Sequence, residues 1–312
     1  MLFTKVIAYN LLKSVPQISL SSNIIFRQSS NADTLKPVKL SYATYESTTS
    51  DRSNQAAPLV IMHGLFGSKS NWNSLCKVYQ QKCHPQRKIV AIDSRNHGDS
   101  PHSDEHTYAH LAADIKALLE QLGIEKAALL GHSMGGRAVM LFALKYPELV
   151  DRLIVEDISP ITTSPNLDSM PSLFQAMEGV TLPSSIPMSQ ARAMVDEQLT
   201  KYIFNKPLRA FLLTNLVATD SGSYTWRINI PVLMKNFNNV ARFPIVNDVC
   251  YDGPVLFVAG KESDFVVKSD YPKIQKLFPN AELTYIEGAG HWLHSEKPSE
   301  FLKITLEFLN SK

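Results

Sequence analysis

The chain has 312 residues, 44% of them hydrophobic and 19% charged, so it can bury the core of one large α/β domain with an insertion or of two smaller domains. Its 31 basic and 29 acidic residues nearly cancel, which argues against a nucleic-acid partner because a phosphate-binding track needs clustered excess Lys and Arg. Three cysteines without C-x-x-C spacing exclude a disulfide framework and a cysteine zinc site, and no apolar run reaches the roughly 18 residues of a transmembrane helix.

Residues 1–32 differ in composition from the rest of the chain. They contain Lys5, Lys13 and Arg27 but no acidic residue, and their apolar residues recur near helical spacing before a serine-rich stretch. An import system driven by a negative-inside potential selects positive charge beside an apolar face. Lys5, Asn10 and Lys13 interrupt the apolar region that a secretory signal needs, and a disordered cytosolic tail is the other alternative. We therefore predict a mitochondrial transit peptide at 1–32 and a location in the mitochondrial matrix.

Short apolar runs alternate with helical patterns along the rest of the chain. Runs without polar alternation are typical of strands covered on both faces, and their alternation with helices predicts a mostly parallel twisted sheet flanked by helices. After a weaker candidate at 38–43, we expect strands at 59–62, 89–92, 127–130, 153–155, 255–258 and 283–286. We expect helices at 108–122, 138–145 and 302–309.

Residues 160–247 interrupt this alternation. The stretch is rich in proline and then shows helical patterns near 189–204 and 207–216. Because the strand–helix pattern resumes afterwards, an insertion between two strands of one sheet accounts for the stretch more economically than an independent domain. We therefore predict an α/β core formed by 33–159 and 248–312, with a helical cap insertion at 160–247.

The segment Gly131-His132-Ser133-Met134-Gly135-Gly136 follows a predicted strand and precedes a predicted helix. That setting distinguishes a nucleophile elbow from an ordinary glycine turn. The bend is so tight that side chains at its flanks would collide, which accounts for the glycines at 131 and 135. We expect Ser133 to be the nucleophile and the backbone N–H of Met134 to donate to the oxyanion.

A serine hydroxyl needs a base to become a good nucleophile. His291 is the candidate, because glycines at 288 and 290 allow its loop to reach the elbow and because the order Ser, acid, His matches that of hydrolases with this motif. The second oxyanion donor is expected in the glycine-rich loop after the strand 59–62. Leu65 or Phe66 would supply it.

Two aspartates compete to be the acid that orients the histidine. Hydrolases of this chain order commonly place it three residues beyond the glycine after strand 255–258, but this position is Ser263 and Asp264 stands one residue late. One step along an extended segment reverses the direction of a side chain. The competitor is Asp157, just after strand 153–155, where the carboxyl ends of parallel strands gather. We favour Asp157 and keep Asp264 as the alternative acid.

Three histidines have a spacing that could bind a metal from one helix, namely His102, His106 and His110. However, Pro101 and Ser103 indicate a loop, and no carboxylate completes a ligand set. We expect no metal site, and the chemistry at Ser133 requires no organic cofactor.

Together these motifs resemble the α/β-hydrolase superfamily and, within it, the family of α/β-hydrolase domain-containing protein 11 and its bacterial esterase relatives. The matching segments are 63–68, 96–103, 131–136, 157–160, 212–216, 226–229 and 288–291. The resemblance implies a serine hydrolase with a helical cap, mitochondrial residence, and activity on carboxylic esters that include acylglycerol lipids. It also implies that the acid is the strand-end aspartate, Asp157. Asp264 is a departure, because the related proteins carry no acid there.

Hydrolysis of a small-molecule or lipid ester through an acyl-enzyme is therefore the leading hypothesis. A thioesterase or a C–C bond hydrolase is the alternative within the same chemistry, whereas epoxide hydrolases and dehalogenases use a carboxylate at the elbow. A non-catalytic protein that binds a mitochondrial partner is the alternative from another class, so a protein partner stays open. No nucleic acid and no transmembrane segment enter any of these hypotheses.

Overall fold

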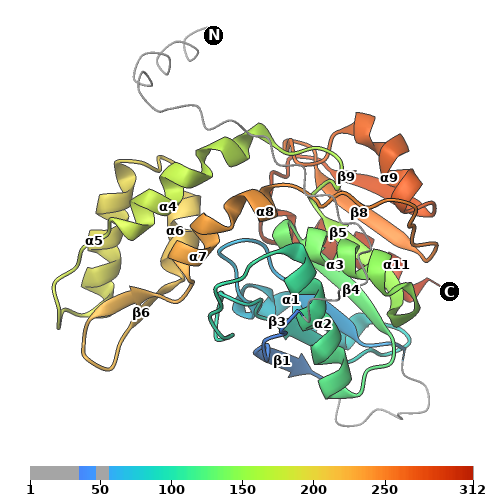
Figure 1. Cartoon of the computed structure of the whole chain (residues 1–312), viewed down its shortest axis with the longest axis horizontal. Helices are drawn as coiled ribbons and strands as arrows, with labels where there is room; N and C mark the ends of the chain where they lie inside the picture. The colour runs from blue at the N-terminus through green and yellow to red at the C-terminus, as the bar shows by residue number, and fades with distance from the viewer. Residues whose placement is uncertain (1–34, 47–55, 312) are drawn as a thin grey trace, which may run out of the picture.

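The apolar runs of the sequence form a seven-stranded sheet in the computed structural model, which describes residues 35–46 and 56–311 (Figure 1). The strand order is β1-β3-β2-β4-β5-β8-β9, with β1 antiparallel to β3 and the other pairs parallel. The strands are β1 (Tyr42–Tyr45), β2 (Leu59–Met62), β3 (Ile89–Ile92), β4 (Ala127–His132), β5 (Val150–Glu156), β8 (Val255–Gly260) and β9 (Ala281–Ile286). The predicted fold class is confirmed. The predicted transit peptide lies outside the described residues.

The strands are apolar at consecutive positions because helices cover both faces of the sheet. Val60 and Met62 belong to the core on one face, whereas Leu59 and Ile61 belong to the core on the other. Helices α2 (Tyr108–Leu122), α3 (Met134–Lys145) and α9 (Tyr271–Leu277) contribute to the first core. Helices α1 (Asn73–Lys82), α10 (Leu293–Glu296) and α11 (Pro298–Asn310) contribute to the second. No helix in the described ranges combines the length and apolarity needed to cross a membrane.

Local signals set the ends of the helices. Helix α2 has the bounds that its pattern predicts, because the Thr107 side chain accepts a hydrogen bond from the His110 N–H and Gly123 ends the helix with φ 63°. Helix α3 begins at Met134 rather than at residue 138, because the chain turns into the helix directly after Ser133. Short 3-10 helices occur at η2 (Lys69–Trp72), η3 (Pro147–Leu149), η4 (Pro165–Ser169) and η5 (Lys268–Asp270).

Between β5 and β8 the chain leaves the sheet and builds a group of helices around an apolar core of its own, drawn to the left of the sheet in Figure 1. We call residues 160–247 the cap and keep these bounds as the sequence predicts them. The elements are α4 (Met170–Glu178), α5 (Met188–Thr200), α6 (Lys206–Leu213), α7 (Ile230–Lys235), α8 (Phe237–Ala241) and the hairpin of β6 (Leu216–Ala218) and β7 (Tyr224–Trp226). Helices α5 and α6 match the two helical patterns, whereas no sequence pattern predicted the hairpin.

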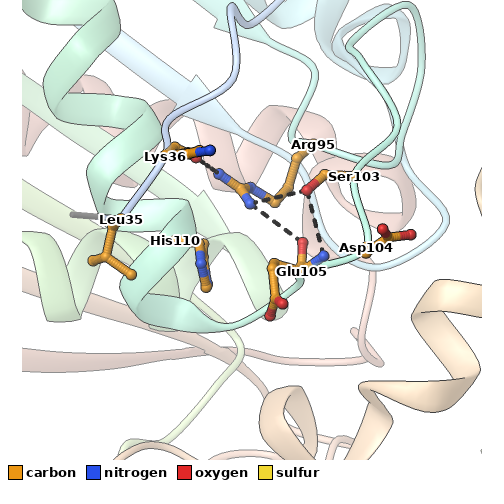
Figure 2. Close-up of a pocket in the computed structure, with 7 residues that line it drawn as sticks. All are labelled: Leu35, Lys36, Arg95, Ser103, Asp104, Glu105 and His110. Carbon is orange, nitrogen blue, oxygen red and sulfur yellow. Dashed lines mark hydrogen bonds between the residues drawn. The ribbon is translucent and has the colours of Figure 1, made fainter. Parts of the chain in front are cut away.

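A buried ion pair fixes the loop that follows β3. Arg95 donates from Nε to Oδ2 of Asp114 at 2.6 Å and from Nη2 to Oδ1 at 2.7 Å. The same guanidinium donates to the carbonyl oxygens of Lys36 and Glu105, beside a cavity of about 590 Å³ (Figure 2). A bidentate pair whose remaining donors are satisfied tolerates burial, whereas removal of one partner would strand a charge. The loop is therefore tied both to α2 and to the segment at Lys36.

Candidate active site

The turn from β4 into α3 is too crowded for side chains at its flanks. A Cβ at Gly131 would lie 2.4 Å from the carbonyl oxygen of Gly135, and a Cβ at Gly135 would lie 2.4 Å from the carbonyl oxygen of Met62. Ser133 adopts φ 53° and ψ −117°, a conformation that a residue with a side chain keeps only where its surroundings enforce it. The crowding thus holds Ser133 in a strained bend at the N-terminus of α3.

Ser133, His291 and Asp157 come together at one edge of the sheet. Nε2 of His291 lies 3.0 Å from Oγ of Ser133, and its Nδ1 lies 2.7 Å from Oδ2 of Asp157. They follow β4, β9 and β5, whose carboxyl ends share this edge. A carboxylate can only accept, so Nδ1 carries the proton and the lone pair of Nε2 faces the hydroxyl. The arrangement can take a proton from Ser133.

The two candidate acids have different partners. Asp157 is fully buried, and its carboxylate accepts hydrogen bonds from the Gly260 N–H at 2.9 Å and from the Ser263 hydroxyl. Asp264 instead accepts hydrogen bonds from the Ser164 hydroxyl at 2.6 Å and from Nδ2 of Asn166 at 3.1 Å. The structure therefore brings Asp157, and not Asp264, to His291. Ser263, which stands at the position where the acid is common in other hydrolases, supports Asp157 with its hydroxyl.

The ring of His291 is held by its neighbours. Phe265 stacks on it with ring centroids 3.9 Å apart, and Trp292 meets it edge-on at 5.4 Å. The backbone carbonyl oxygen of His291 accepts a hydrogen bond from Nε2 of His132 at 2.8 Å. Both the ring and the backbone of the candidate base are thus fixed.

The sequence proposed the backbone N–H of Leu65 or of Phe66, in the loop after β2, as the second oxyanion donor, and only one of the two is free among the described residues. The N–H of Phe66 donates to Nε2 of His97 at 3.2 Å, and the carbonyl oxygen of Phe66 accepts from Nδ2 of Asn215 at 2.8 Å. Within the described part of the chain, the N–H groups of Leu65 and Met134 donate to no acceptor. Leu65 is therefore the residue that can pair with Met134 as an oxyanion donor.

Two buried histidines keep this loop in place as neutral acceptors. Nδ1 of His97 donates to the carbonyl oxygen of Arg95 at 3.0 Å, so its Nε2 is free to accept from Phe66. Nδ1 of His63 donates to the carbonyl oxygen of Gly64, and its Nε2 accepts from the Ser94 N–H. Burial lowers the pKa of His63 and holds that of His97 well below the usual value. The sequence patterns assigned neither histidine a role, although both lie in segments that carried the family resemblance.

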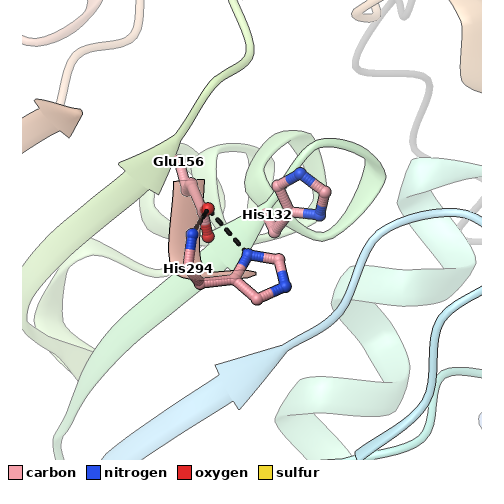
Figure 3. Close-up of side chains that lie close together, drawn as sticks. All are labelled: His132, Glu156 and His294. Atoms are coloured by element: carbon pink, nitrogen blue, oxygen red, sulfur yellow. Dashed lines mark hydrogen bonds and ion pairs between the residues drawn. The ribbon is translucent and has the colours of Figure 1, made fainter. Parts of the chain in front are cut away.

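Three further side chains meet beneath the elbow (Figure 3). His132 ends β4 and Glu156 ends the neighbouring β5, and with His294 they place donor atoms within 4.8 Å of one another. Glu156 Oε1 accepts from the N–H and from Nδ1 of His294, while its Oε2 has no partner among the described residues. Burial, together with the neighbouring His291 and His294, holds the pKa of His132 well below its usual value. The cluster is a packed, hydrogen-bonded layer behind the candidate base, and only His132 of the three belongs to a sequence motif.

The three histidines with the spacing of metal ligands face different partners. His102 donates from Nε2 to the carbonyl oxygen of Arg227 at 3.0 Å, and His110 contacts the Thr107 hydroxyl at 2.9 Å. Nδ1 of His106 accepts from Nδ2 of Asn96 at 3.3 Å. Burial, followed by the charge of Arg95, lowers the pKa of His106 to about 3.

Known proteins resemble the chain over most of its length. A family model described as alpha/beta hydrolase fold matches residues 57–298. The sn-1-specific diacylglycerol lipase ABHD11 of Danio rerio is 44% identical, over 88% of this chain and 84% of the relative. Esterase YbfF of Escherichia coli is 30% identical, over 84% of this chain and 96% of the relative. A solved marine microorganism esterase aligns with a TM-score of 0.78 and 36% identity, over 87% of this chain and 99% of the other.

Acid should destabilise the folded chain through its buried histidines. Those at 63, 97, 106 and 132 have folded pKa values below the unfolded value of about 6.5, so only the unfolded chain takes up their protons as the pH falls. Their stabilising effect is present above that pH and is lost below it, down to about pH 3 for His106. We expect each of these four histidines to lower the free energy of unfolding by up to about 1.4 kcal/mol for every pH unit that the pH falls below about 6.5.

Urea unfolding at a series of pH values measures this slope. His106→Gln removes one group that binds a proton only in the unfolded chain. It should therefore reduce the slope of the unfolding free energy against pH by up to about 1.4 kcal/mol per pH unit. His84→Gln, at an exposed position, is the matched control and should leave the slope unchanged. A free energy of unfolding that stays constant between about pH 7 and about pH 5 would contradict the prediction.

Proposed function

The chain belongs to the alpha/beta hydrolase fold family, and from this premise we propose that it is a serine hydrolase that cleaves carboxylic esters through an acyl-enzyme. The observation that carries the proposal is the 3.0 Å contact between Nε2 of His291 and Oγ of Ser133, with Asp157 behind the imidazole. Relatives named as a diacylglycerol lipase and an esterase support lipid esters, acylglycerols among them, as the substrate class.

In the first half-reaction, Ser133 attacks the ester carbonyl while Nε2 of His291 takes the hydroxyl proton. Asp157 holds the imidazole in the required tautomer and stabilises the imidazolium, because its buried carboxylate accepts from Nδ1. The proton on Nε2 then passes to the departing alkoxide. Ser133 keeps the acyl group, and the alcohol leaves.

Backbone N–H groups stabilise the charge that develops on the carbonyl oxygen. Met134 is the first residue of α3, so its N–H has no partner within the helix and lies at the positive end of the helix dipole. Leu65 supplies the second N–H, since that of Phe66 is bound to His97. In the second half-reaction, His291 takes a proton from the water that attacks the acyl-enzyme, and the same donors stabilise the oxyanion. The bond between the acyl group and Oγ of Ser133 then breaks, the proton on Nε2 returns to Oγ, and the carboxylic acid leaves.

The cap adds an apolar wall to this site. Phe66 and Leu65 pack against the apolar core of the cap, and Phe66 meets Phe174 edge-on with ring centroids 5.2 Å apart. Apolar side chains next to the loop of Leu65 and Phe66 favour an ester with a hydrocarbon acyl group over a charged substrate.

An active-site-directed fluorophosphonate tests the nucleophile. We expect the wild-type chain to be labelled and Ser133→Ala to remain unlabelled, because the reagent forms a bond only with an activated serine. The thermal unfolding midpoint of both proteins serves as the folding control. A folded wild-type chain that resists labelling would eliminate the serine-hydrolase proposal. A panel of p-nitrophenyl esters, acylglycerols and acyl thioesters then defines the substrate, and faster thioester hydrolysis would move the assignment to a thioesterase.

The matched pair Asp157→Asn and Asp264→Asn tests the acid. Asn at 157 cannot hold the imidazole in the tautomer that accepts from Ser133, so kcat should fall by about 10⁴-fold. Asn at 264 keeps an oxygen for its partners Ser164 and Asn166 and should change kcat by less than about tenfold. Equal small losses in the two variants would be incompatible with Asp157 as the triad acid.

We further propose that residues 1–32 direct the chain to mitochondria. The proposal rests on their composition, which combines three basic residues with no acid. A fluorescent protein fused behind these residues should accumulate in mitochondria. Reversal of the charges with Lys5→Glu, Lys13→Glu and Arg27→Glu should abolish this accumulation, since the membrane potential then opposes entry. Diffuse cytosolic fluorescence of the unaltered fusion would refute the proposal.

A further inference from the structure

The turn that joins α5 to α6 displays two aromatic side chains to solvent. Phe204 is 90% exposed and Tyr202 is 65% exposed. Side chains of this size are normally covered, and a pair of them two residues apart forms a patch rather than one stray contact. We call residues 201–206 the tip of the cap.

The tip is held in its conformation by a buried side chain. Arg209 is 7% exposed and donates from Nη1 to the carbonyl oxygens of Ile203 at 2.8 Å and of Phe204 at 3.3 Å. Its Nε donates to Oδ1 of Asp196 at 2.7 Å, so α5 also braces the turn. Ile203 is buried in the core of the cap between the two exposed aromatic residues. The fold therefore presents Tyr202 and Phe204 outward while Ile203 anchors the turn.

Charge at the tip identifies the surface that it fits. Lys201 and Lys206 are exposed on either side of the aromatic pair, whereas the carboxylate of Asp196 is already paired with Arg209. The nearest exposed acid along α5 is Glu197, so the tip carries a net positive charge. Aromatic rings between lysines are typical of segments that lie in the interfacial region of a bilayer with anionic lipids.

The size of the patch argues against a protein partner. A stable protein–protein interface buries about 800 Å² on each side, which two exposed side chains on one turn do not supply. A lipid surface needs no such area of complementary shape, because rings can enter between headgroups. The small exposed tip therefore fits a lipid surface better than a protein surface.

Helix α6 connects the tip with the candidate active site. Pro207, Leu208 and Phe211 of this helix line a cavity of about 400 Å³, together with Trp292 from the core. The rings of Phe211 and Trp292 lie 6.0 Å apart, and Trp292 is in edge-on contact with His291. One helix thus leads from the exposed aromatic pair to the side chain beside the candidate base.

We propose that the tip, residues 201–206, docks the protein onto the interfacial region of an anionic lipid bilayer. Phe204 and Tyr202 enter the headgroup layer, and Lys201 and Lys206 contact anionic headgroups. This docking does not depend on the chemistry of Ser133. Its use, which is to bring the cavity under α6 to a lipid ester, rests on the proposed function.

Vesicle binding by full-length Ser133→Ala tests the docking without any turnover of lipid. Sedimentation with phosphatidylcholine vesicles that contain phosphatidylglycerol should show binding, and vesicles of phosphatidylcholine alone should bind more weakly. The pair Tyr202→Ser and Phe204→Ser should weaken binding by about tenfold or more, and so should Lys201→Glu with Lys206→Glu. Ile245→Ser with Val249→Ser is the matched control, since both residues are exposed and apolar outside the tip. Thermal unfolding midpoints verify that each variant is folded.

A local probe separates the tip from residues 1–32, whose positive charge also attracts anionic lipid. Tryptophan fluorescence of Phe204→Trp should be quenched by vesicles with brominated acyl chains, after subtraction of the parent signal. Ile245→Trp, treated in the same way, should be unaffected. Equal quenching at the two positions, absence of quenching at 204, or a serine pair that binds as tightly as its control would overturn the proposal. Because none of these readouts requires catalysis, failure of the docking is distinguishable from failure of the esterase chemistry.

Discussion

The close approach of β2, β4 and α3 at the elbow is the constraint on which the site depends. The carbonyl oxygen of Met62 lies only 2.4 Å from the place that a Cβ of residue 135 would take, so the chain can enter α3 only through a bend without side chains at its flanks. That bend forces Ser133 into φ 53° and places it at the N-cap of α3, directly before the first helical residue. Because β2 leads directly into the loop of Leu65, the same approach brings both candidate oxyanion donors, Leu65 and Met134, to the Ser133 side of the sheet edge. Backbone packing, rather than side-chain choice, therefore positions the candidate nucleophile.

Neutral imidazoles form a second layer of organisation. His63 and His97 each donate through Nδ1 to a carbonyl oxygen and accept a backbone N–H through Nε2. A protonated ring has no acceptor, so it could not retain the N–H of Ser94 or of Phe66. Burial keeps the rings neutral, and neutrality keeps the loops after β2 and β3 in register with each other. The loop after β2, which carries the candidate oxyanion donor Leu65, thus depends on the protonation state of residues that do not contact the Ser133 hydroxyl.

The sequence predicted the parts of the molecule that backbone geometry dictates. Strands buried on both faces and the elbow are visible in it because continuous apolar runs and obligatory glycines are compatible with few backbone structures. The choice between Asp157 and Asp264 was open, because it depends on the side-chain direction after β8 and on Ser263, whose hydroxyl fills the place of the usual carboxylate. The choice between Leu65 and Phe66 was open for the same kind of reason, since it depends on a contact with His97. Hairpin β6–β7 was missed because its strands are three residues long, which is too short for a two-residue period to be recognised in the sequence.

The cap is attached to the core by more than its two chain connections. Asn215 binds the carbonyl oxygen of Phe66, and Asn229 donates from its backbone N–H and its side chain to Asn96. Two amide side chains of the inserted segment thereby hold the loops after β2 and β3 at the edge of the sheet where Ser133, His291 and Asp157 meet. For protein engineering, this means that a chimera with a cap from another protein would misplace the loop after β2 unless the new cap kept equivalents of Asn215 and Asn229. Substrate selectivity is therefore better redesigned by changing the apolar side chains of the cap that face the candidate site than by replacing residues 160–247 as a whole.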